Sequence, residues 1–186
     1  MHMTSRNIIL FVLAAVVGIA AGIAYPIIGL VLLVPMLIFI AFILLRNRGG
    51  KEADPATAEA ARQFTAPADK AAIYIMRHGF VGGQQGMNVT VDDTLTSQFR
   101  TGRFVRAEVS PGPHTIAGRL AAQIGGTDKL HQVTLAPGEC VLLDAKLDMG
   151  ALQSKLVFLE TRDPAEARAK LAKLKLVEWK ATPTAA

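Results

Sequence analysis

The sequence predicts a mainly β protein, in which a small antiparallel β-sandwich-like domain follows an N-terminal two-helix transmembrane hairpin and includes a short C-terminal helix. Two observations carry this fold class. Residues Ile8 to Leu45 contain no charged side chain. From Ala71 onward, apolar and polar residues alternate, which is the pattern of half-buried strands. The predicted boundaries are residues 1–45 for the membrane segment, 46–69 for a linker and 70–180 for the β domain.

The apolar stretch is too long for one crossing. As one helix it would extend about 57 Å at ~1.5 Å per residue, against a hydrocarbon core of roughly 30 Å. Pro26 divides it into residues 8–25 and 27–45, each close to the ~20 residues that a crossing requires, and proline suits the first turn of a helix. We therefore expect a helical hairpin. A cleaved signal peptide is the alternative for the first half, since Arg6 and the small residues up to Ala24 imitate one, but a second apolar segment follows at once.

Positive charges flank the apolar stretch at its outer ends. These membrane-flanking residues are Arg6, Arg46, Arg48 and Lys51. The positive-inside rule predicts that both ends, and with them the β domain, lie in the cytoplasm. The alternative is a domain that faces the periplasm. Because no ionisable residue lies inside the stretch, transport by the hairpin alone is not expected.

Small residues recur every four positions in the first predicted helix, at Ala14, Gly18 and Gly22. Such a stripe lets helix backbones approach closely. It favours packing of the two helices of the hairpin on each other, with self-association as the alternative.

Composition narrows the range of partners. The formal charge is +5, but the excess lies beside the apolar stretch and in the C-terminal tail, and the middle of the chain is nearly neutral. This distribution argues against nucleic acid, which requires a concentrated basic face, and suits an anionic lipid surface. Cys140 is the only cysteine, which excludes an intramolecular disulfide.

Seven strands are expected in the β domain, because period-two segments alternate with Gly/Pro turn clusters. They are residues 72–77, 87–92, 103–109, 114–122, 131–135, 141–147 and 155–160. Before them, Asp54 and Pro55 are suited to start a short helix that reaches Phe64. After them, a helix over residues 164–175 begins at the N-cap acceptor Asp163, and its narrow apolar stripe favours docking on the sandwich over a membrane surface.

Four segments of the chain resemble an uncharacterised bacterial family, domain of unknown function 2846. They are AAIYIMRHGFVGG (Ala71 to Gly83), VSPGPHTI (Val109 to Ile116), LAPGECVLLDAKL (Leu135 to Leu147) and LAKLKLVEW (Leu171 to Trp179). The resemblance implies a β-sandwich-like domain on bacterial envelope proteins, without an assigned reaction. Members of the family are often lipoproteins, whereas no cysteine precedes Cys140 here. We therefore expect the hairpin to supply the anchor, in the bacterial inner membrane.

Arg77-His78-Gly79 after an apolar strand resembles the opening of the histidine phosphatases, in which an imidazole accepts a phosphoryl group beside a guanidinium. Such chemistry needs further charge stabilisation, and a second histidine would have to be His114 or His131. That family alternates strands and helices, whereas another strand follows here. A phosphatase that uses Arg77 and His78 is therefore only the third and least favoured hypothesis, and the protein is not expected to be an enzyme.

The loop Gly82, Gly83, Gln84, Gln85 and Gly86 leads into a strand rather than into a helix N-terminus, so it lacks the setting of a phosphate cradle. It remains the predicted place of contact with a partner or ligand. The histidines show no HxH or HExxH spacing, and neither a metal nor a cofactor is expected.

Together these features predict an accessory or protein-interaction subunit at the bacterial inner membrane. Its expected partners are the lipid bilayer and a membrane protein or a second copy of the chain. The alternative is a module that binds a ligand or a lipid headgroup.

Overall fold

The computed structural model describes residues 22, 25–46, 50–79, 86–121, 127–149 and 154–180. The chain divides into two compact units, residues Met1–Leu45 and Arg46–Ala186. In the first unit, helix α2 spans Pro26–Arg46 and contains Pro35. Among the described residues, no helix is both long and apolar enough to cross a membrane, so the predicted transmembrane hairpin is not supported there.

Large apolar side chains of α2 are exposed, among them Ile27 at 80% and Leu45 at 71%. At the start of this helix the backbone is closely packed, because a Cβ atom added to Gly29 would lie 3.2 Å from the carbonyl oxygen of Gly22. The other two residues of the predicted small-residue stripe, Ala14 and Gly18, lie outside the described residues.

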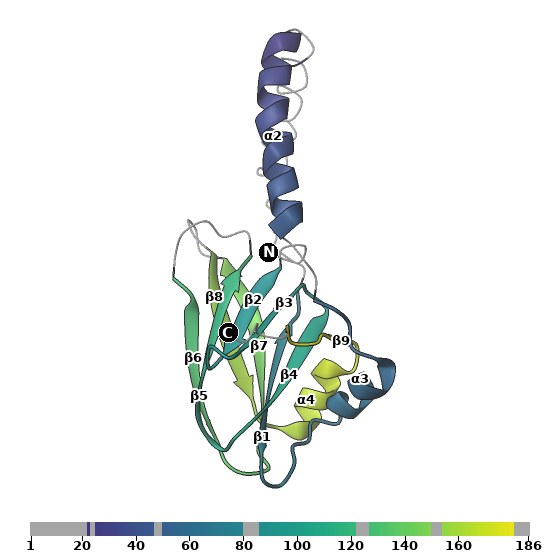
Figure 1. Cartoon of the computed structure of the whole chain (residues 1–186), viewed down its shortest axis with the longest axis vertical. Coiled ribbons are helices and arrows are strands. Elements are labelled where there is room, and N and C mark those ends of the chain that lie inside the picture. The colour runs from purple at the N-terminus through teal and green to yellow at the C-terminus, as the bar shows by residue number, and fades with distance from the viewer. Residues whose placement is uncertain are drawn as a thin grey trace, which may run out of the picture. The chain divides into compact units, whose positions relative to one another are not determined.

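The second unit is a sandwich of two β-sheets, with helices α3 (Pro55–Arg62) and α4 (Pro164–Leu171) beside one of them (Figure 1). The five-stranded sheet has the order β8 (Ser154–Thr161), β7 (Cys140–Met149), β1 (Ala71–Arg77), β4 (Arg103–Val109) and β9 (Lys175–Leu176). The four-stranded sheet has the order β3 (Leu95–Phe99), β2 (Met87–Val91), β5 (Gly112–Leu120) and β6 (Lys129–Leu135). The prediction of a mainly β, sandwich-like domain is confirmed. The sheets are not wholly antiparallel, because β1 pairs with β7 and β4 pairs with β9 in parallel.

Strand β1 is buried along its whole length because both of its faces are covered. Ala71, Ile73 and Ile75 lie in the core between the two sheets. The alternate residues, which include Tyr74, lie in a second core with side chains from α3 and α4. Side chains alternate between the faces of a strand, so the central strand supplies both cores at once.

The segment expected to be a linker is folded onto the β domain from residue 50 onward. Ala58, Ala61 and Phe64 are buried in the second core. The predicted cap is present, since the Thr57 amide donates a hydrogen bond of 2.9 Å to Oδ1 of Asp54. The chain after α2 therefore joins the domain without a free linker of the predicted length.

Replacing Asp54 with alanine should remove this cap and lower the free energy of unfolding, since the first N–H groups of a helix have no partner within it. Urea unfolding measures the change. Asp69→Ala, at an exposed position outside any helix, is the control and should stay within about 0.5 kcal/mol of wild type. Equal losses in both variants would contradict the capping role.

Helix α4 and strand β3 differ from the sequence prediction. Helix α4 stops at Leu171, before the expected residue 175, and Leu174 and Leu176 are then buried in the second core. Strand β3 was not predicted, because Ser97 and Gln98 interrupt its apolar pattern. Both are nevertheless buried and bonded: Ser97 Oγ donates to the carbonyl of Glu178 at 3.2 Å, and Gln98 pairs with a side chain of β2.

Residues 50–53 and 175–180 run beside each other along the β3/β9 side of the domain, and we call this pair of segments the clasp. The Gly50 amide donates to the carbonyl of Gln98 at 2.8 Å, and Glu52 forms an antiparallel bridge with Val177. The clasp therefore joins the segment that enters the β domain to the segment that ends it.

A polar network joins the edge strands β6 and β8. Arg162, just after β8, pairs with Glu139 and Glu160 and also donates to the carbonyl of Thr134 in β6. Glu139 in turn accepts a hydrogen bond of 2.8 Å from the Ala136 amide. This amide, and after it Arg162, holds the pKa of Glu139 below its ordinary value, although burial opposes the shift.

The lowered pKa of Glu139 predicts a loss of stability in acid. A carboxyl whose folded-state pKa is depressed stabilises the fold above its unfolded value, and this contribution is lost as the pH falls through the folded value. The window therefore lies below the ordinary value of 4.5. Glu139→Gln should be less stable near neutral pH and show a flatter decline in acid, measured by urea unfolding across pH. An unchanged acid slope would contradict this role.

Candidate functional site

The structure places the sequence-predicted loop only in part. Gly82, Gly83, Gln84 and Gln85 lie outside the described residues. Gly86 is buried, and its carbonyl accepts a hydrogen bond of 2.8 Å from the Ala121 amide. This residue therefore fixes where β2 begins, beside the end of β5, and the predicted contact with a partner at this loop stays a prediction.

Arg77 and His78 differ in their surroundings. The Arg77 side chain is 2% exposed, and burial lowers the pKa of its guanidinium. It shares the side of β1 that carries Ile75 and thus points toward the core between the sheets. His78 is exposed. A buried guanidinium and an exposed imidazole do not present a joint phosphate site.

The other two predicted histidines lie away from His78. His114 is 7% exposed, and its ring nitrogens lie 2.6 Å from Oδ2 of Asp92 and 2.7 Å from the carbonyl of Ser110. Ser110 follows β4 at the end that pairs with the start of β1, opposite to His78. Nε2 of His131 lies 3.5 Å from Oε2 of Glu160. The described residues therefore do not assemble the histidine pair that a phosphatase requires.

The Asp92–His114 contact has a structural role in the turn between β2 and β3. Asp92 and Asp93 have φ angles of 49° and 54°, the left-handed region that aspartate tolerates in tight turns. Oδ1 of Asp92 also accepts the Thr115 amide at 2.8 Å. With both carboxylate oxygens engaged, this pair locks the turn against β5.

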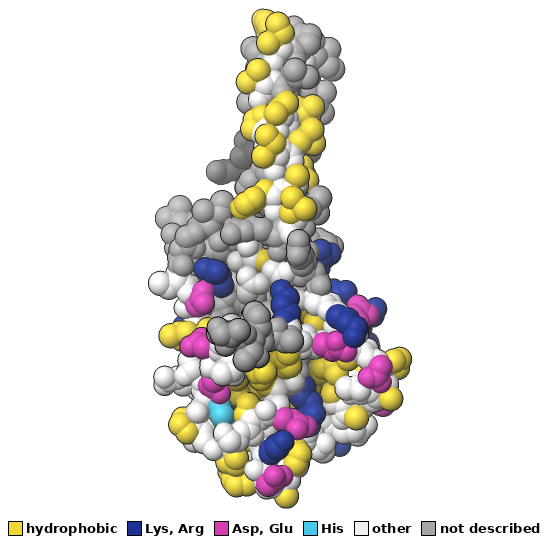
Figure 2. Space-filling model, in the orientation of Figure 1, with side chains coloured by type: hydrophobic (Ala, Val, Ile, Leu, Met, Phe, Trp, Pro, Cys, Tyr) yellow, Lys and Arg dark blue, Asp and Glu magenta, His cyan; other side chains and the backbone are white. Residues whose placement is uncertain are grey.

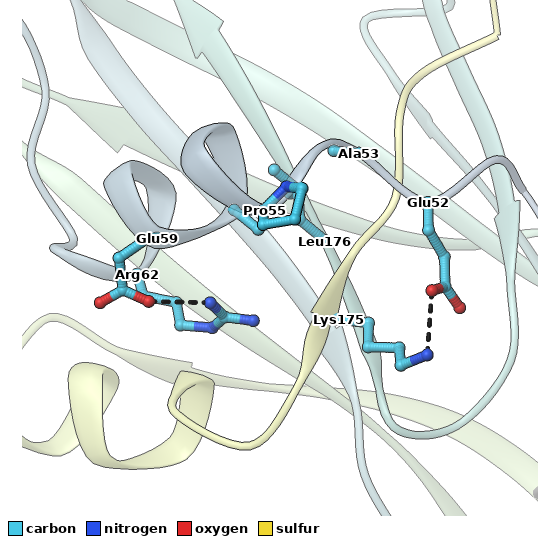
Figure 3. A pocket seen from close by; sticks show the side chains of 8 residues that line it. Glu52, Ala53, Pro55, Glu59, Arg62, Lys175 and Leu176 are labelled. Atoms are coloured by element: carbon cyan, nitrogen blue, oxygen red, sulfur yellow. Dashed lines mark hydrogen bonds and ion pairs between the residues drawn. The ribbon is translucent and has the colours of Figure 1, made fainter.

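A pocket of about 290 Å³ lies where α3 meets β9 (Figure 3). Its lining residues are Glu52, Ala53, Pro55, Ala58, Glu59, Arg62, Lys175 and Leu176. On one side Arg62 pairs with Glu59 at 3.0 Å, and on the other Lys175 pairs with Glu52 at 2.9 Å. Pro55 and Leu176 lie between the two ion pairs (Figure 3). Opposite charges balance on both sides, so the pocket suits a small ligand with an apolar part and mixed polar groups.

Sequence reasoning missed this pocket because its walls come from segments more than a hundred residues apart, of which one was expected to be a linker. The only signal was the capped helix start at Asp54. Lys51, predicted to flank the membrane, lies in the clasp and pairs with Glu178 at 3.1 Å. Arg103 adds a second contact to Glu52 at 3.0 Å. Lys175 and then Arg103 hold the pKa of Glu52 below its ordinary value.

Metal-binding groups do not cluster in the described part of the chain, where no three His, Cys, Asp or Glu side chains are placed to hold an ion. Cys140 is a buried free thiol, and burial raises its pKa. A thiol with a raised pKa is a poor nucleophile near neutral pH. We accordingly assign Cys140 to packing in the second core.

Comparison with known proteins gave no match, either to a family model or to a curated protein. The resemblance to domain of unknown function 2846 thus rests on the four sequence segments alone.

Proposed function

We propose that the protein is a membrane-anchored, non-enzymatic module that presents its β domain to a partner at the bacterial inner membrane. The observation that carries the proposal is the uncharged stretch from Ile8 to Leu45 in the same chain as a folded domain with two cores of its own. Exposed apolar side chains on α2 support it. In water such a surface is unfavourable by ~25 cal/mol per Å², whereas lipid covers it.

The finer form of the proposal is a hairpin of residues 8–25 and 27–45 that crosses the membrane twice. It rests on the sequence alone, because its first half lies outside the described residues and no described helix meets the length and apolarity of a membrane crossing. The close backbone approach of Gly29 to Gly22 supports a tight turn between the two halves. With Arg6, Arg46 and Arg48 at the outer ends, the β domain faces the cytoplasm.

Protease treatment of spheroplasts tests this orientation on a full-length protein with a C-terminal epitope. The epitope should survive outside protease and be lost only after the membrane is permeabilised. Digestion of the β domain in intact spheroplasts would place it in the periplasm and overturn the cytoplasmic assignment.

An interaction role for the β domain is supported because several of its titratable residues stabilise the fold. Arg77, Asp92, His114 and Glu139 each serve the fold, either buried in it or bonded to its turns. On native gels in mild detergent, the full-length protein should migrate as a complex larger than a monomer, containing a membrane protein or a second copy. A monomer at all detergent concentrations would contradict this function.

A second candidate function is favoured by the pocket between α3 and β9: binding of a small ligand. Lys175→Ala and Glu59→Ala remove one charge from each side of it. A ligand found by thermal-shift screening of the full-length protein should lose its shift in both variants, whereas Asp69→Ala should keep it. A shift that survives both substitutions would exclude this pocket.

A further inference from the structure

The strands of the β domain end at two opposite poles. The turn at residues 100–102 joins β3 to β4, so the end of β3 and the start of β4 lie at one pole, and the end of β1 pairs with the start of β4. Gly50 binds β3 near the same pole. We call this the entry pole, because the chain enters the β domain here. The turns at residues 92–94, 110–111 and 136–139 lie at the opposite, far pole.

Basic side chains prevail at the entry pole. They are Lys51, Arg100, Arg103, Arg119, Lys129 and Lys175. The acidic residues nearby include Glu52, Asp128 and Glu178, and each of these already pairs with one of those cations. Asp148, near the end of β7, also lies at this pole, opposite Lys155 in the register of β7 and β8. Part of this distribution is visible as dark-blue side chains in the upper half of the β domain in Figure 2. The entry pole therefore carries a net positive charge.

Acidic side chains prevail at the far pole. They include Asp69, Asp92, Asp93, Glu108, Glu139, Glu160 and Asp163, against the cations Lys70, Arg106, Arg162 and Lys180. The chain visits the two poles in turn, so opposite charges cancel along the sequence although they are separated in space. This is why the middle of the chain looks neutral in composition.

We propose that the entry pole binds the anionic lipid surface of the membrane that holds residues 8–45, and this inference rests on the proposed function. Only residues 47–49 separate α2 from Gly50, and the positive Arg46 and Arg48 belong to the same part of the chain. Electrostatic attraction to lipid headgroups acts within about 8 Å at physiological salt. A basic pole beside an anionic leaflet is attracted to it, and the acidic far pole is repelled.

The far pole is then directed away from the membrane, toward the aqueous phase. It is the part of the β domain that remains accessible to a soluble segment of a partner. Lipid contact at the entry pole thus determines which surface of the β domain is accessible to a soluble partner.

The experiment uses the full-length protein in lipid nanodiscs with a quencher on the headgroups. A fluorophore is attached at Thr127→Cys near the entry pole or at Ser110→Cys at the far pole, both in a Cys140→Ala background. In discs with phosphatidylglycerol, the Thr127 probe should be quenched and the Ser110 probe should not. High salt, or discs of phosphatidylcholine alone, should relieve the quenching.

Two charge variants with equal net charge provide the matched comparison. Lys129→Gln with Lys175→Gln removes two charges from the entry pole and should lower the ratio of docked to undocked domain about fivefold for each charge. Lys70→Gln with Arg168→Gln removes two charges elsewhere and should leave the ratio unchanged. Equal effects of both pairs would overturn the proposal, because they would show a response to net charge only.

The outcomes separate this inference from the function on which it rests. If the protein does not stay in the discs, membrane anchoring itself fails and the inference fails with it. If the protein stays in the discs but quenching is equal for both probes, or is independent of lipid charge and salt, the inference alone is overturned.

Discussion

Tyr74→Ala is expected to lower the free energy of unfolding of the β domain by about 3–5 kcal/mol, the range for truncation of large buried aromatic side chains. Tyr74 is fully buried in the second core. Its ring centroid lies 4.8 Å from that of Phe64 and 6.5 Å from that of Phe104. Urea unfolding measures the loss, followed by fluorescence of Trp179, the only tryptophan.

Tyr74→Phe is the matched control, because it keeps the ring and removes only the hydroxyl. Arg106 Nε donates to this hydroxyl at 3.0 Å, and the hydroxyl donates to the carbonyl of Thr65 at 3.4 Å. The lost hydrogen bonds should cost about 1–3 kcal/mol, less than loss of the whole side chain. Equal losses in the two variants would contradict the view that the ring fills the second core.

Gly50→Ala should destabilise the domain by about 1–3 kcal/mol or more, the cost of overpacking a closed site. An added Cβ would lie 2.2 Å from Cγ1 of Val177 and 2.9 Å from the carbonyl oxygen of Gln98. The β-branched side chain of Val177 is stiff, and the oxygen belongs to the backbone of β3. The clasp must therefore shift or open, which urea unfolding detects.

Val177→Ala provides the double-mutant test of this contact. It removes the clashing methyl group at the expense of a small cavity, so the double variant should lose less stability than the sum of the two single variants. The Gln98 carbonyl still opposes the new Cβ, so the rescue should be incomplete. Strict additivity would contradict a steric clash between residues 50 and 177.

Sequence periodicity predicted the strands that expose one face to solvent. It failed where contacts with distant parts of the chain decide whether a segment forms a strand and which strand it pairs with. The alternation at Met87, Val89 and Val91 matches β2, whose intervening residues are only half-buried. In β3, by contrast, the polar Ser97 and Gln98 are buried and find partners that local sequence does not reveal. The prediction of wholly antiparallel sheets failed for a similar reason, since parallel pairing depends on which distant segments meet.

Composition was a poor guide to residues 46–69. Their Gly, Pro, Ala and charged residues are typical of a linker, yet the small side chains of Ala58 and Ala61 allow α3 to lie close to the sheet. Phe64 then adds an aromatic contact to Tyr74. The N-cap at Asp54 could be predicted because its signal is local in the sequence. The docking of α3 on the sheet could not be predicted in this way.

The candidate site could be predicted only where chemistry is local. Arg77 and His78 are adjacent in the chain, but Arg77 ends β1 with a buried side chain, whereas His78 follows the strand and is exposed. The pocket between α3 and β9, the clasp and the separation of charge between the two poles all join distant segments. Each depends on the order of strands in the sheets, which the spacing of residues does not specify.

The central claim is that residues 8–45 hold a folded β domain at a membrane, and alkaline carbonate extraction tests it most directly. Membranes are prepared from cells that make the full-length protein and from cells that make a chain starting at residue 50. We expect the full-length protein to stay in the membrane pellet, whereas the shortened chain should be found in the supernatant. Release of the full-length protein into the supernatant would contradict membrane anchoring by residues 8–45.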